Sequence, residues 1–213
     1  MKLISTSFDN VYLIKEDVFE DERGYFMESW NELKYSNRKL LADIPSLQAI
    51  KNDNSLFNTL FVQDNFSVSE KHVFRGLHYQ TGIWEQAKLV RVLKGSVIDF
   101  IVDLREQSKT YGKFDYFELN ETNKLSLFIP PYFAHGFLSL EDNTIFTYKC
   151  GNYYSKEHEG SINVFDPIMR NVTDNHQTIT DAVSLYMPYE DENDLILSEK
   201  DRNAPKFLYR RHD

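Results

Sequence analysis

The sequence predicts an all-β fold, a jelly-roll β-barrel with a few short peripheral helices. Three observations support this class: short strand-like segments follow one another from Leu60 to Cys150, turn residues separate them about every ten positions, and one early segment has a helical pattern. The chain has 213 residues, of which 41% are hydrophobic and 15% aromatic, so it can bury a sizeable core. We therefore expect a single domain over residues 1–213.

Residues 1–58 are expected to contribute N-terminal strands and one helix. The helix is predicted within WNELKYSNRKLLADI, because Ser29 and Glu32 have the spacing of a capping box, leucines recur at helical intervals, and Pro45 ends the pattern. We expect this helix to pack on the surface of the barrel.

Residues 59–150 are expected to form the barrel core. The predicted strand segments are LFVQDNFSVS, VFRGLHYQ, KLVRVLKGSVIDFIVDLR, FDYFELN, LSLFIP and HGFLSLEDNTIFTYKC. Gly95 interrupts the third segment and predicts a hairpin there. After it, Ile98 and Phe100 share one face of a strand, whereas Asp99 and Ile101 share the other.

Residues 151–213 have fewer strand patterns, an acidic PYEDEND stretch and several Asn and Asp turn residues. We interpret them as a C-terminal extension that wraps the barrel. Within it, NVTDNHQTITDAVSLYM has an ambiguous periodicity that fits either a short helix or an irregular excursion.

Charge and composition limit the classes of partner. A formal net charge of −9 argues against general nucleic-acid binding and against binding to an anionic membrane surface. No apolar run approaches the roughly 18 residues of a membrane helix and the first residues lack a secretory pattern, so a cytoplasmic protein is expected. The single cysteine, Cys150, is interpreted as a buried, inert thiol.

His78 and Lys88 are the residues best suited to acid–base chemistry, and we expect them on neighbouring strands. A histidine can take a proton near neutral pH, and a lysine in the same apolar pocket can stabilise the negative charge that remains. Arg75 has the opposite strand parity to His78. Both can point inward only if the chain bulges or bends near Gly76, which a glycine permits.

Six blocks of sequence carry a resemblance to a known family. They are DERGYFMESW, FVQDNFSVSEKHVFRGLHYQ, QAKLVRVLKGSVIDFIVDLR, LFIPPYFAHGFLSL, FTYKCGNYYSKEHEGSI and LILSEKD. In order and spacing, over nearly the whole chain, they resemble the dTDP-4-dehydrorhamnose 3,5-epimerases, nucleotide-sugar epimerases with a cupin-type jelly roll. The resemblance implies epimerisation at C3 and C5 of a nucleoside-diphosphate-linked, here dTDP-linked, 4-keto-6-deoxyhexose, as in dTDP-L-rhamnose biosynthesis.

The same resemblance implies a catalytic set of four residues. The C4 ketone acidifies the hydrogens at C3 and C5, and inversion needs a base on one face and an acid on the other. His78 matches the family's base, and Asp201 matches the carboxylate that orients its imidazole. Lys88 matches the lysine that stabilises the enolate oxygen, and Tyr148 matches the acid that returns a proton from the opposite face.

The resemblance also implies substrate-binding residues. They are Arg23, Phe26, Glu28, Gln63, Asn65, Arg75, His135, Tyr154 and Glu159. Arginines suit the paired oxygens of a pyrophosphate, and His135 is expected to fix the sugar or the lysine rather than to transfer a proton. In this family an N-terminal arm commonly reaches across a dimer. The resemblance thus implies a homodimer whose N-terminal contacts serve the partner's pocket, with no metal and no other cofactor.

Other functions stay open on the sequence alone. A 3-epimerase or a 3,4-ketoisomerase acting on a dTDP-, GDP- or CDP-linked keto sugar would use the same fold, although the complete catalytic set favours epimerisation. A metal-dependent cupin typically uses a His-x-His pair, whereas Gln80 stands two residues after His78. A non-catalytic sugar-binding module would bind the nucleotide sugar without solvent proton exchange.

The sequence departs from the family's pattern at three places. Tyr132 and His72 stand where the family has glycine, so a positive φ at either residue would be strained. The family's I-x-W-N-D-P block reads INVFDP here, with Val164 and Phe165 in place of the tryptophan and asparagine.

Overall fold

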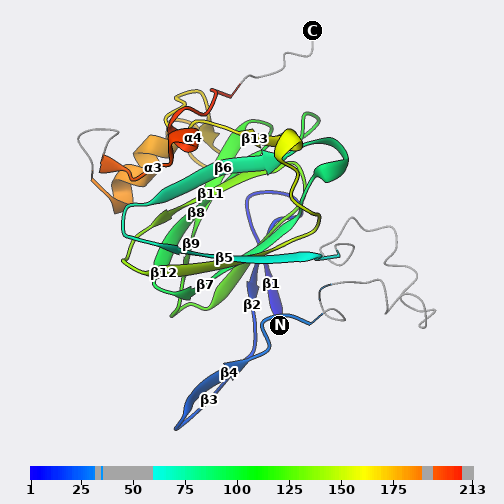
Figure 1. The fold of residues 1–213 in the computed structure, drawn as a ribbon, viewed down its shortest axis with the longest axis vertical. Coiled ribbons are helices and arrows are strands. Elements are labelled where there is room, and N and C mark those ends of the chain that lie inside the picture. The colour runs from blue at the N-terminus through cyan, green and yellow to red at the C-terminus, as the bar shows by residue number, and fades with distance from the viewer. Residues whose placement is uncertain (32–34, 36–59, 189–193, 208–213) are drawn as a thin grey trace, which may run out of the picture.

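Two β-sheets that face each other form the body of the protein (Figure 1). The computed structural model describes residues 1–31, 35, 60–188 and 194–207. Within these residues, each of the two sheets has six strands, and they build the cupin-like jelly roll that the sequence predicts. Most of the helix predicted within WNELKYSNRKLLADI lies outside the described residues.

The first sheet, sheet I, combines N-terminal strands with strands of the central segment. In spatial order it contains β1 (Lys2–Ser5), β2 (Tyr12–Lys15), β10 (Leu125–Ile129), β7 (Lys88–Lys94), β12 (Thr144–Cys150) and β5 (Gln63–Ser69). All of these neighbours pair antiparallel. The antiparallel pairing of β2 with β10 thus brings the start of the chain into the barrel.

The second sheet, sheet II, combines central strands with strands of the C-terminal segment. In spatial order it contains β13 (Glu159–Ser161), β6 (Phe74–Gln80), β11 (Phe133–Ser139), β8 (Ser96–Asp103), β9 (Lys113–Asn120) and β14 (Arg170–Asn171). Its pairings are antiparallel except for β14 with β9.

The chain crosses from sheet I to sheet II at Gly95, so the prediction of a hairpin there is wrong. β7 pairs with β10 and β12, whereas β8 pairs with β11 and β9. Gly95 has a φ of +80°, and a Cβ at this position would lie 2.4 Å from the Oγ1 of Thr144. A tight glycine turn is compatible with a hairpin and with a crossing between sheets. Strand periodicity does not reveal which sheet each strand joins.

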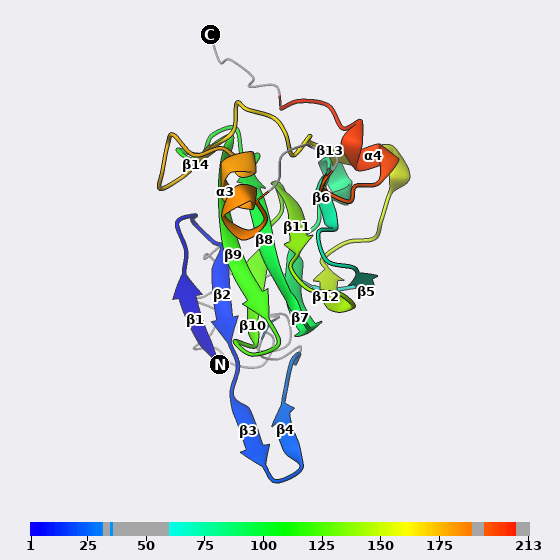
Figure 2. The ribbon, with the colours of Figure 1, turned by 90° about the vertical axis from the view of Figure 1, so that its left-hand side faces the viewer.

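The two faces of β8 pack into different parts of the core, as the predicted alternation requires. Ile101 belongs to the cluster between the sheets, together with Val90 and Phe146 of sheet I. Phe100 belongs to a second cluster on the outer face of sheet II, where it packs with Val183 and other residues of α3 (Ile179–Tyr186). Figure 2 shows α3 lying over β8 and β9. The ambiguous segment therefore contains a helix that covers sheet II.

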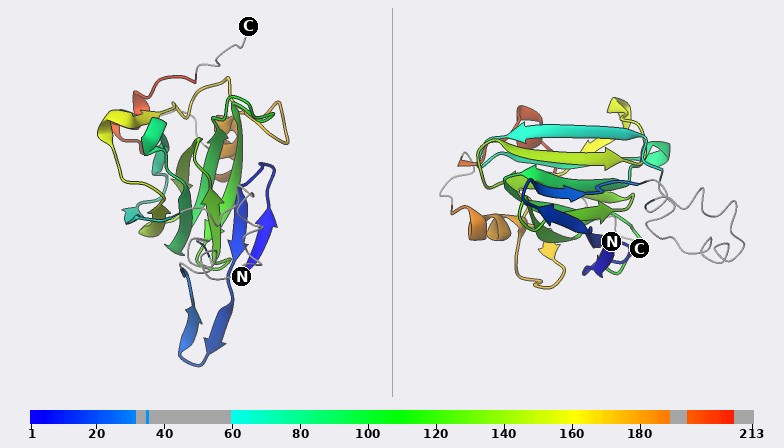
Figure 3. Two further views of the ribbon diagram at one scale, coloured as in Figure 1. Left: turned by 90° about the vertical axis from the view of Figure 1, so that its right-hand side faces the viewer. Right: turned by 90° about the horizontal axis from the view of Figure 1, so that it is seen from below.

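Short helices and a projecting hairpin complete the described structure. The helices are η3 (Gly82–Trp84), η4 (Lys156–His158) and α4 (Glu199–Arg202). The strands β3 (Val18–Asp21) and β4 (Gly24–Met27) form a two-stranded hairpin that points away from the barrel (Figure 3). The helices lie at the end of the barrel opposite this hairpin (Figure 1).

Candidate active site

A cavity with two lobes opens between sheet I and sheet II. The lobes have volumes of about 310 Å³ and 280 Å³, and His78, Lys88 and Tyr148 line both of them. Asp201 lines the second lobe. The fold therefore brings together all four residues that the sequence proposes for catalysis.

His78 and Asp201 form the closest pair in this cavity. The Nε2 of His78, on β6, lies 2.5 Å from the Oδ1 of Asp201, on α4. Ser198 caps α4 by accepting the backbone N–H of Asp201 at 3.1 Å. Burial by itself raises the pKa of Asp201, but its hydrogen bond with His78, together with those from Ser198 and the Gly76 backbone, holds that pKa below its ordinary value. Asp201 is therefore the ionised acceptor, which leaves the lone pair of His78 on Nδ1.

A β-bulge lets Arg75 and His78 face the same lobe. His135 of β11 pairs with His78, but Phe137 pairs with Arg75, so the register shifts between these positions. Gly76 lies at the shift with a φ of +123°. Both Arg75 and His78 line the second lobe. The bend predicted near Gly76 is confirmed.

Lys88 reaches the cavity from the opposite sheet. It starts β7 in sheet I, whereas His78 lies on β6 in sheet II, so the expectation of neighbouring strands is wrong. The cause is the loop around η3, which carries the chain from one sheet to the other. Burial lowers the pKa of Lys88, and nearby Cys150 and Asp99 partly oppose this shift. Among the described residues, the ammonium group has no hydrogen-bond or ion-pair partner within the usual distances.

Tyr148 also faces the cavity from sheet I. It lies on β12, between Asn65 of β5 and Val90 of β7 in the sheet register. Burial raises the pKa of Tyr148, an effect that Arg75 opposes. The phenol therefore keeps its proton at neutral pH, as a proton donor must.

A second histidine–carboxylate pair lies beside the cavity. The Nε2 of His135 and the Oδ2 of Asp99 share a hydrogen bond of 2.8 Å, and both side chains are almost completely buried. Burial lowers the pKa of His135 and raises that of Asp99, so the imidazole is neutral. Asp99 was not among the predicted site residues. The sequence feature that could have indicated a role for Asp99 is a carboxylate in the middle of the otherwise apolar strand segment VIDFIV.

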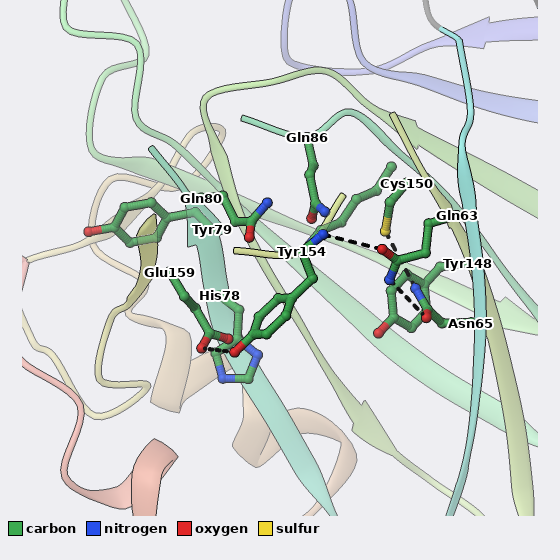
Figure 4. A pocket seen from close by; sticks show the side chains of 11 residues that line it. Gln63, Asn65, His78, Tyr79, Gln80, Gln86, Tyr148, Cys150, Tyr154 and Glu159 are labelled. Atoms are coloured by element: carbon green, nitrogen blue, oxygen red, sulfur yellow. Dashed lines mark hydrogen bonds between the residues drawn. The ribbon is translucent and has the colours of Figure 1, made fainter. Parts of the chain in front are cut away.

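Glu159, Tyr154 and Lys200 form a polar group at the edge of the cavity. Tyr154 donates its hydroxyl to Glu159 at 3.0 Å (Figure 4). The ammonium of Lys200 lies 2.6 Å from the same carboxylate. Burial raises the pKa of Glu159, but these two partners together hold it below its ordinary value. Lys200 was also missed by sequence reasoning, although it directly precedes Asp201.

Gln63 and Asn65 line the first lobe, but the hairpin residues do not reach it. Gln63 and Asn65 lie on β5 and face the cavity (Figure 4). Arg23 and Phe26 lie on or next to the tip of the β3–β4 hairpin, and the Arg23 side chain is 84% exposed. Glu28 follows the hairpin and accepts a hydrogen bond from Asn31. None of the three hairpin-side residues lines either lobe within this chain.

The departures from the family's pattern lie outside the cavity lining. Tyr132 and His72 both have a φ of +68°, so each holds the left-handed conformation in which glycine is favoured. Val164 is buried in the cluster under α3, and Phe165 packs against that cluster. None of these four residues lines either lobe, so the substitutions are accommodated in loops and core.

Two other features bear on the class of protein. In the part of the chain that the structure describes, no helix has the length and apolar character required to cross a bilayer. In the same part, no three His, Cys, Asp or Glu side chains gather in a group that could hold a metal ion.

Known proteins share both the sequence and the fold. The family model described as dTDP-4-dehydrorhamnose 3,5-epimerase matches residues 5–208. A relative of this name from Methanothermobacter thermautotrophicus is 41% identical over 202 residues, which cover 95% of this chain and 92% of the relative.

Solved structures agree with this match. A dTDP-4-dehydrorhamnose 3,5-epimerase from Elizabethkingia anophelis superposes with a TM-score of 0.73 at 43% identity, covering 97% of this chain and 96% of the other. An enzyme from Legionella pneumophila, described as a dTDP-6-deoxy-D-glucose-3,5-epimerase in complex with dTDP-4-keto-L-rhamnose, has a TM-score of 0.73 at 36% identity and coverages of 96% and 92%. The chain therefore belongs to the dTDP-4-dehydrorhamnose 3,5-epimerase family.

Proposed function

We propose that this protein is an isomerase that inverts C3 and C5 of a dTDP-linked 4-keto-6-deoxyhexose on the route to dTDP-L-rhamnose. Membership of the family and the ligand of the Legionella pneumophila relative support this substrate. The observation that carries the chemistry is the single cavity in which the His78–Asp201 pair, Lys88 and Tyr148 converge from two facing sheets.

The first half of each inversion is a proton abstraction. The Nδ1 of His78 takes the proton from the carbon next to the C4 ketone, and the electron pair of that C–H bond moves into an enolate. The Asp201 carboxylate stabilises the imidazolium that forms and fixes the ring orientation. The Lys88 ammonium, which is buried at the cavity, stabilises the negative enolate oxygen.

The second half is a proton return on the other face. Tyr148 gives its phenolic proton to the same carbon, a new C–H bond forms, and the enolate collapses to the ketone. The tyrosinate regains a proton and the imidazolium loses one to solvent, so one proton leaves and one arrives at each centre. Burial keeps Tyr148 protonated before the step because it raises the pKa of the phenol. The sequence of steps then repeats at the second carbon.

Substrate binding is proposed to involve the remaining predicted residues. Arg75 supplies a guanidinium at the second lobe for phosphate oxygens. The first lobe offers Gln63, Asn65, Tyr154 and Glu159 as hydrogen-bonding groups. His135, held by Asp99, fixes the side of the cavity near Lys88 rather than transferring a proton.

We also propose a homodimer in which the β3–β4 hairpin serves the partner's cavity with Arg23, Phe26 and Glu28. The support is the exposure of this hairpin, where Phe19, Tyr25 and Phe26 are 63%, 53% and 69% exposed. Aromatic surface of this extent on a thin two-stranded ribbon is typical of an interaction site. The cytoplasmic location expected from the sequence stays a prediction.

Proton exchange with solvent tests the proposed reaction. The protein is incubated with dTDP-4-keto-6-deoxyglucose in D₂O, and NMR follows deuterium at C3 and C5. Entry of deuterium at both carbons is expected, and none at either carbon would sink the proposal for this substrate. Deuterium at C3 alone would identify a 3-epimerase. GDP- and CDP-linked analogues in parallel reactions test the nucleotide, and His78→Ala, which is expected to show no exchange, tests the base.

A further inference from the structure

A chain of hydrogen bonds crosses one wall of the first lobe. The backbone N–H of Tyr154 donates to the Oε1 of Gln63 at 3.2 Å, and the Nε2 of Gln63 donates to the Oδ1 of Asn65 at 3.0 Å. The Nδ2 of Asn65 then donates to the Sγ of Cys150 at 3.6 Å. Figure 4 shows these groups side by side, and all four residues line the lobe.

The direction of this chain follows from its first member. A backbone N–H can only donate, so the oxygen of the Gln63 amide must accept and its NH₂ group must point onward. Asn65 must then present its oxygen to Gln63, which turns its own NH₂ group toward Cys150. Reversal of either amide would place two donors or two acceptors against each other.

Cys150 ends the chain because its sulfur accepts. The residue is 2% exposed, and burial raises the pKa of its thiol, so the group is neutral at physiological pH. It lies on β12 between Gln63 of β5 and Lys88 of β7 in the sheet register. The sequence-based view of Cys150 as buried holds, but the side chain lines the cavity rather than only filling the core.

We propose that the sulfur of Cys150 is a positioning group: by accepting the last hydrogen bond of the chain it holds the Asn65 amide, and through it the Gln63 amide, in place, so that each keeps one N–H for a substrate oxygen that carries no hydrogen. Each NH₂ group uses one N–H in the chain and keeps a second one for this purpose. The cross-strand neighbour of Cys150, Lys88, adds a further donor that lacks a hydrogen-bond partner among the described residues.

The proposal rests on the proposed function for its ligand. In a nucleotide-linked keto sugar, the oxygens without hydrogen include the pyrophosphate oxygens and the C4 carbonyl oxygen of the sugar, and these are the two sources considered for this wall. dTDP alone and dTDP-4-keto-6-deoxyglucose distinguish them, since only the second has the C4 carbonyl of the sugar. Thymidine, which has no phosphate, controls for the oxygens of the base.

The test compares Cys150→Ala, which removes the acceptor, with Cys150→Ser, which replaces it by a hydroxyl oxygen. Val92→Ala is the matched control, because Val92 is a buried apolar residue of the adjacent strand β7 that lines neither lobe. The side-chain NH₂ signals of Asn65 are followed by ¹⁵N NMR of the whole protein and identified by their loss in Asn65→Asp. Affinity for dTDP and the steady-state constants for the keto sugar are measured beside them.

In Cys150→Ala we expect the Asn65 signals to shift and the affinity for dTDP, the keto sugar or both to fall about three- to ten-fold, the range of one hydrogen bond. If the wall binds phosphate oxygens, kcat should stay within about two-fold, because a group that binds ground and transition states equally changes KM alone. If it binds the C4 carbonyl oxygen, kcat should fall as well, because that oxygen gains negative charge in the enolate. Weaker dTDP binding with unchanged thymidine binding assigns the wall to phosphate oxygens, and weaker binding of the keto sugar alone assigns it to the C4 carbonyl. Cys150→Ser should restore both the signals and the affinity.

Unchanged Asn65 signals or unchanged affinities in Cys150→Ala would overturn the proposal. An equal loss of affinity in Val92→Ala would also overturn it, because the effect would then come from packing. A Cys150→Ser variant that behaves like Cys150→Ala would have the same consequence. A wild-type protein that shows no exchange in D₂O refutes the proposed reaction instead, while the Asn65 signals and dTDP binding still decide the role of Cys150.

Discussion

The two histidines at the cavity each have a carboxylate partner, whereas Lys88 has no hydrogen-bond or ion-pair partner among the described residues. His78 is held by Asp201 and His135 by Asp99. The Lys88 ammonium is buried with only longer-range electrostatic support from carboxyl groups such as Asp99 and Glu159. A cation without a close partner is suited to meet a charge that appears during the reaction.

The pH dependence of the reaction should report the state of Lys88. Its pKa lies below the ordinary 10.5 because of burial, so the ammonium loses its proton at a lower pH than an exposed lysine would. Activity needs the charged form, so kcat/KM should fall as the pH rises through this lowered pKa. In Lys88→Arg the charge persists, and the alkaline fall should move to higher pH even though kcat decreases. An alkaline limb at the same pH in both proteins would assign it to another group.

Replacement of Asp201 should separate orientation of the base from its presence. In Asp201→Asn, an amide N–H can face the Nε2 of His78, which would favour the tautomer whose proton sits on Nδ1 and so block the base. We expect kcat to fall about 10²- to 10⁴-fold with little loss of substrate affinity. Glu199→Gln is the control, since Glu199 is an exposed carboxylate on the same helix. Equal kinetics of Asp201→Asn and wild type would contradict the role of the pair.

Tyr148→Phe should uncouple exchange from inversion. His78 can still remove the proton and return a deuteron to the same face, whereas the phenol that supplies the opposite face is absent. In D₂O we expect deuterium to enter with retention of configuration, which NMR coupling constants reveal. Inversion at an undiminished rate would show that another group is the acid.

At the level of elements, the bulge between β6 and β11 places His78, the proposed base. Gly76 and Gly136 approach each other so closely that a Cβ at Gly76 would lie 2.5 Å from the Cα of Gly136 and 2.7 Å from the carbonyl oxygen of His135. The register shift at this point turns both Arg75 and His78 toward the cavity. Two small residues in contact therefore make the active-site geometry of β6 possible.

Gly76→Ala should destabilise the fold as well as the site. The new Cβ meets backbone atoms that cannot yield, and φ is +123°, so we expect a loss of roughly 2–4 kcal/mol in the free energy of unfolding. Gly82→Ala provides the matched control, because Gly82 also has a positive φ but open space around its Cβ, and it should cost only about 1 kcal/mol. Urea unfolding of both variants measures the difference, and equal losses would show that the close approach is unimportant.

For the whole molecule, the β3–β4 hairpin is exposed and does not reach the cavity of its own chain, which is the basis of the proposed exchange between two subunits. Arg23 pairs only locally with Asp21, and the aromatic residues of the hairpin are mostly exposed. In the proposed homodimer, a second copy of the chain would cover this surface and receive Arg23 as an additional cation at its proposed phosphate-binding cavity.

Mixed dimers can test this arrangement. Arg23→Ala and His78→Ala are each expected to be almost inactive, but when the two are refolded together one dimer in two should combine both chains. Such a dimer has one complete cavity, formed by the intact His78 of one subunit and the intact Arg23 of the other, so about a quarter of wild-type activity should return. No recovery, with mixed dimers verified by mass spectrometry, would place Arg23 at its own subunit's cavity or at none.

Local patterns in the sequence were sufficient to predict the strands and to name most of the residues of the candidate site. The alternation in the segment around Phe100 follows from the two-residue period of a strand, and the need for a bend near Gly76 follows from the parity of Arg75 and His78. The sequence likewise determined which residue types are available for acid–base chemistry, and the six ordered blocks indicated the family.

Only the tertiary structure decided how these residues meet. Gly95 marks a turn in either case, but the pairing of β7 and β8 with different sheets depends on packing between strands far apart in the chain. Because of that pairing, Lys88 faces His78 across a cavity instead of lying beside it. Burial and charge partners set the pKa shifts of Lys88, Tyr148 and Asp99, and both are properties of the folded surroundings rather than of any local pattern.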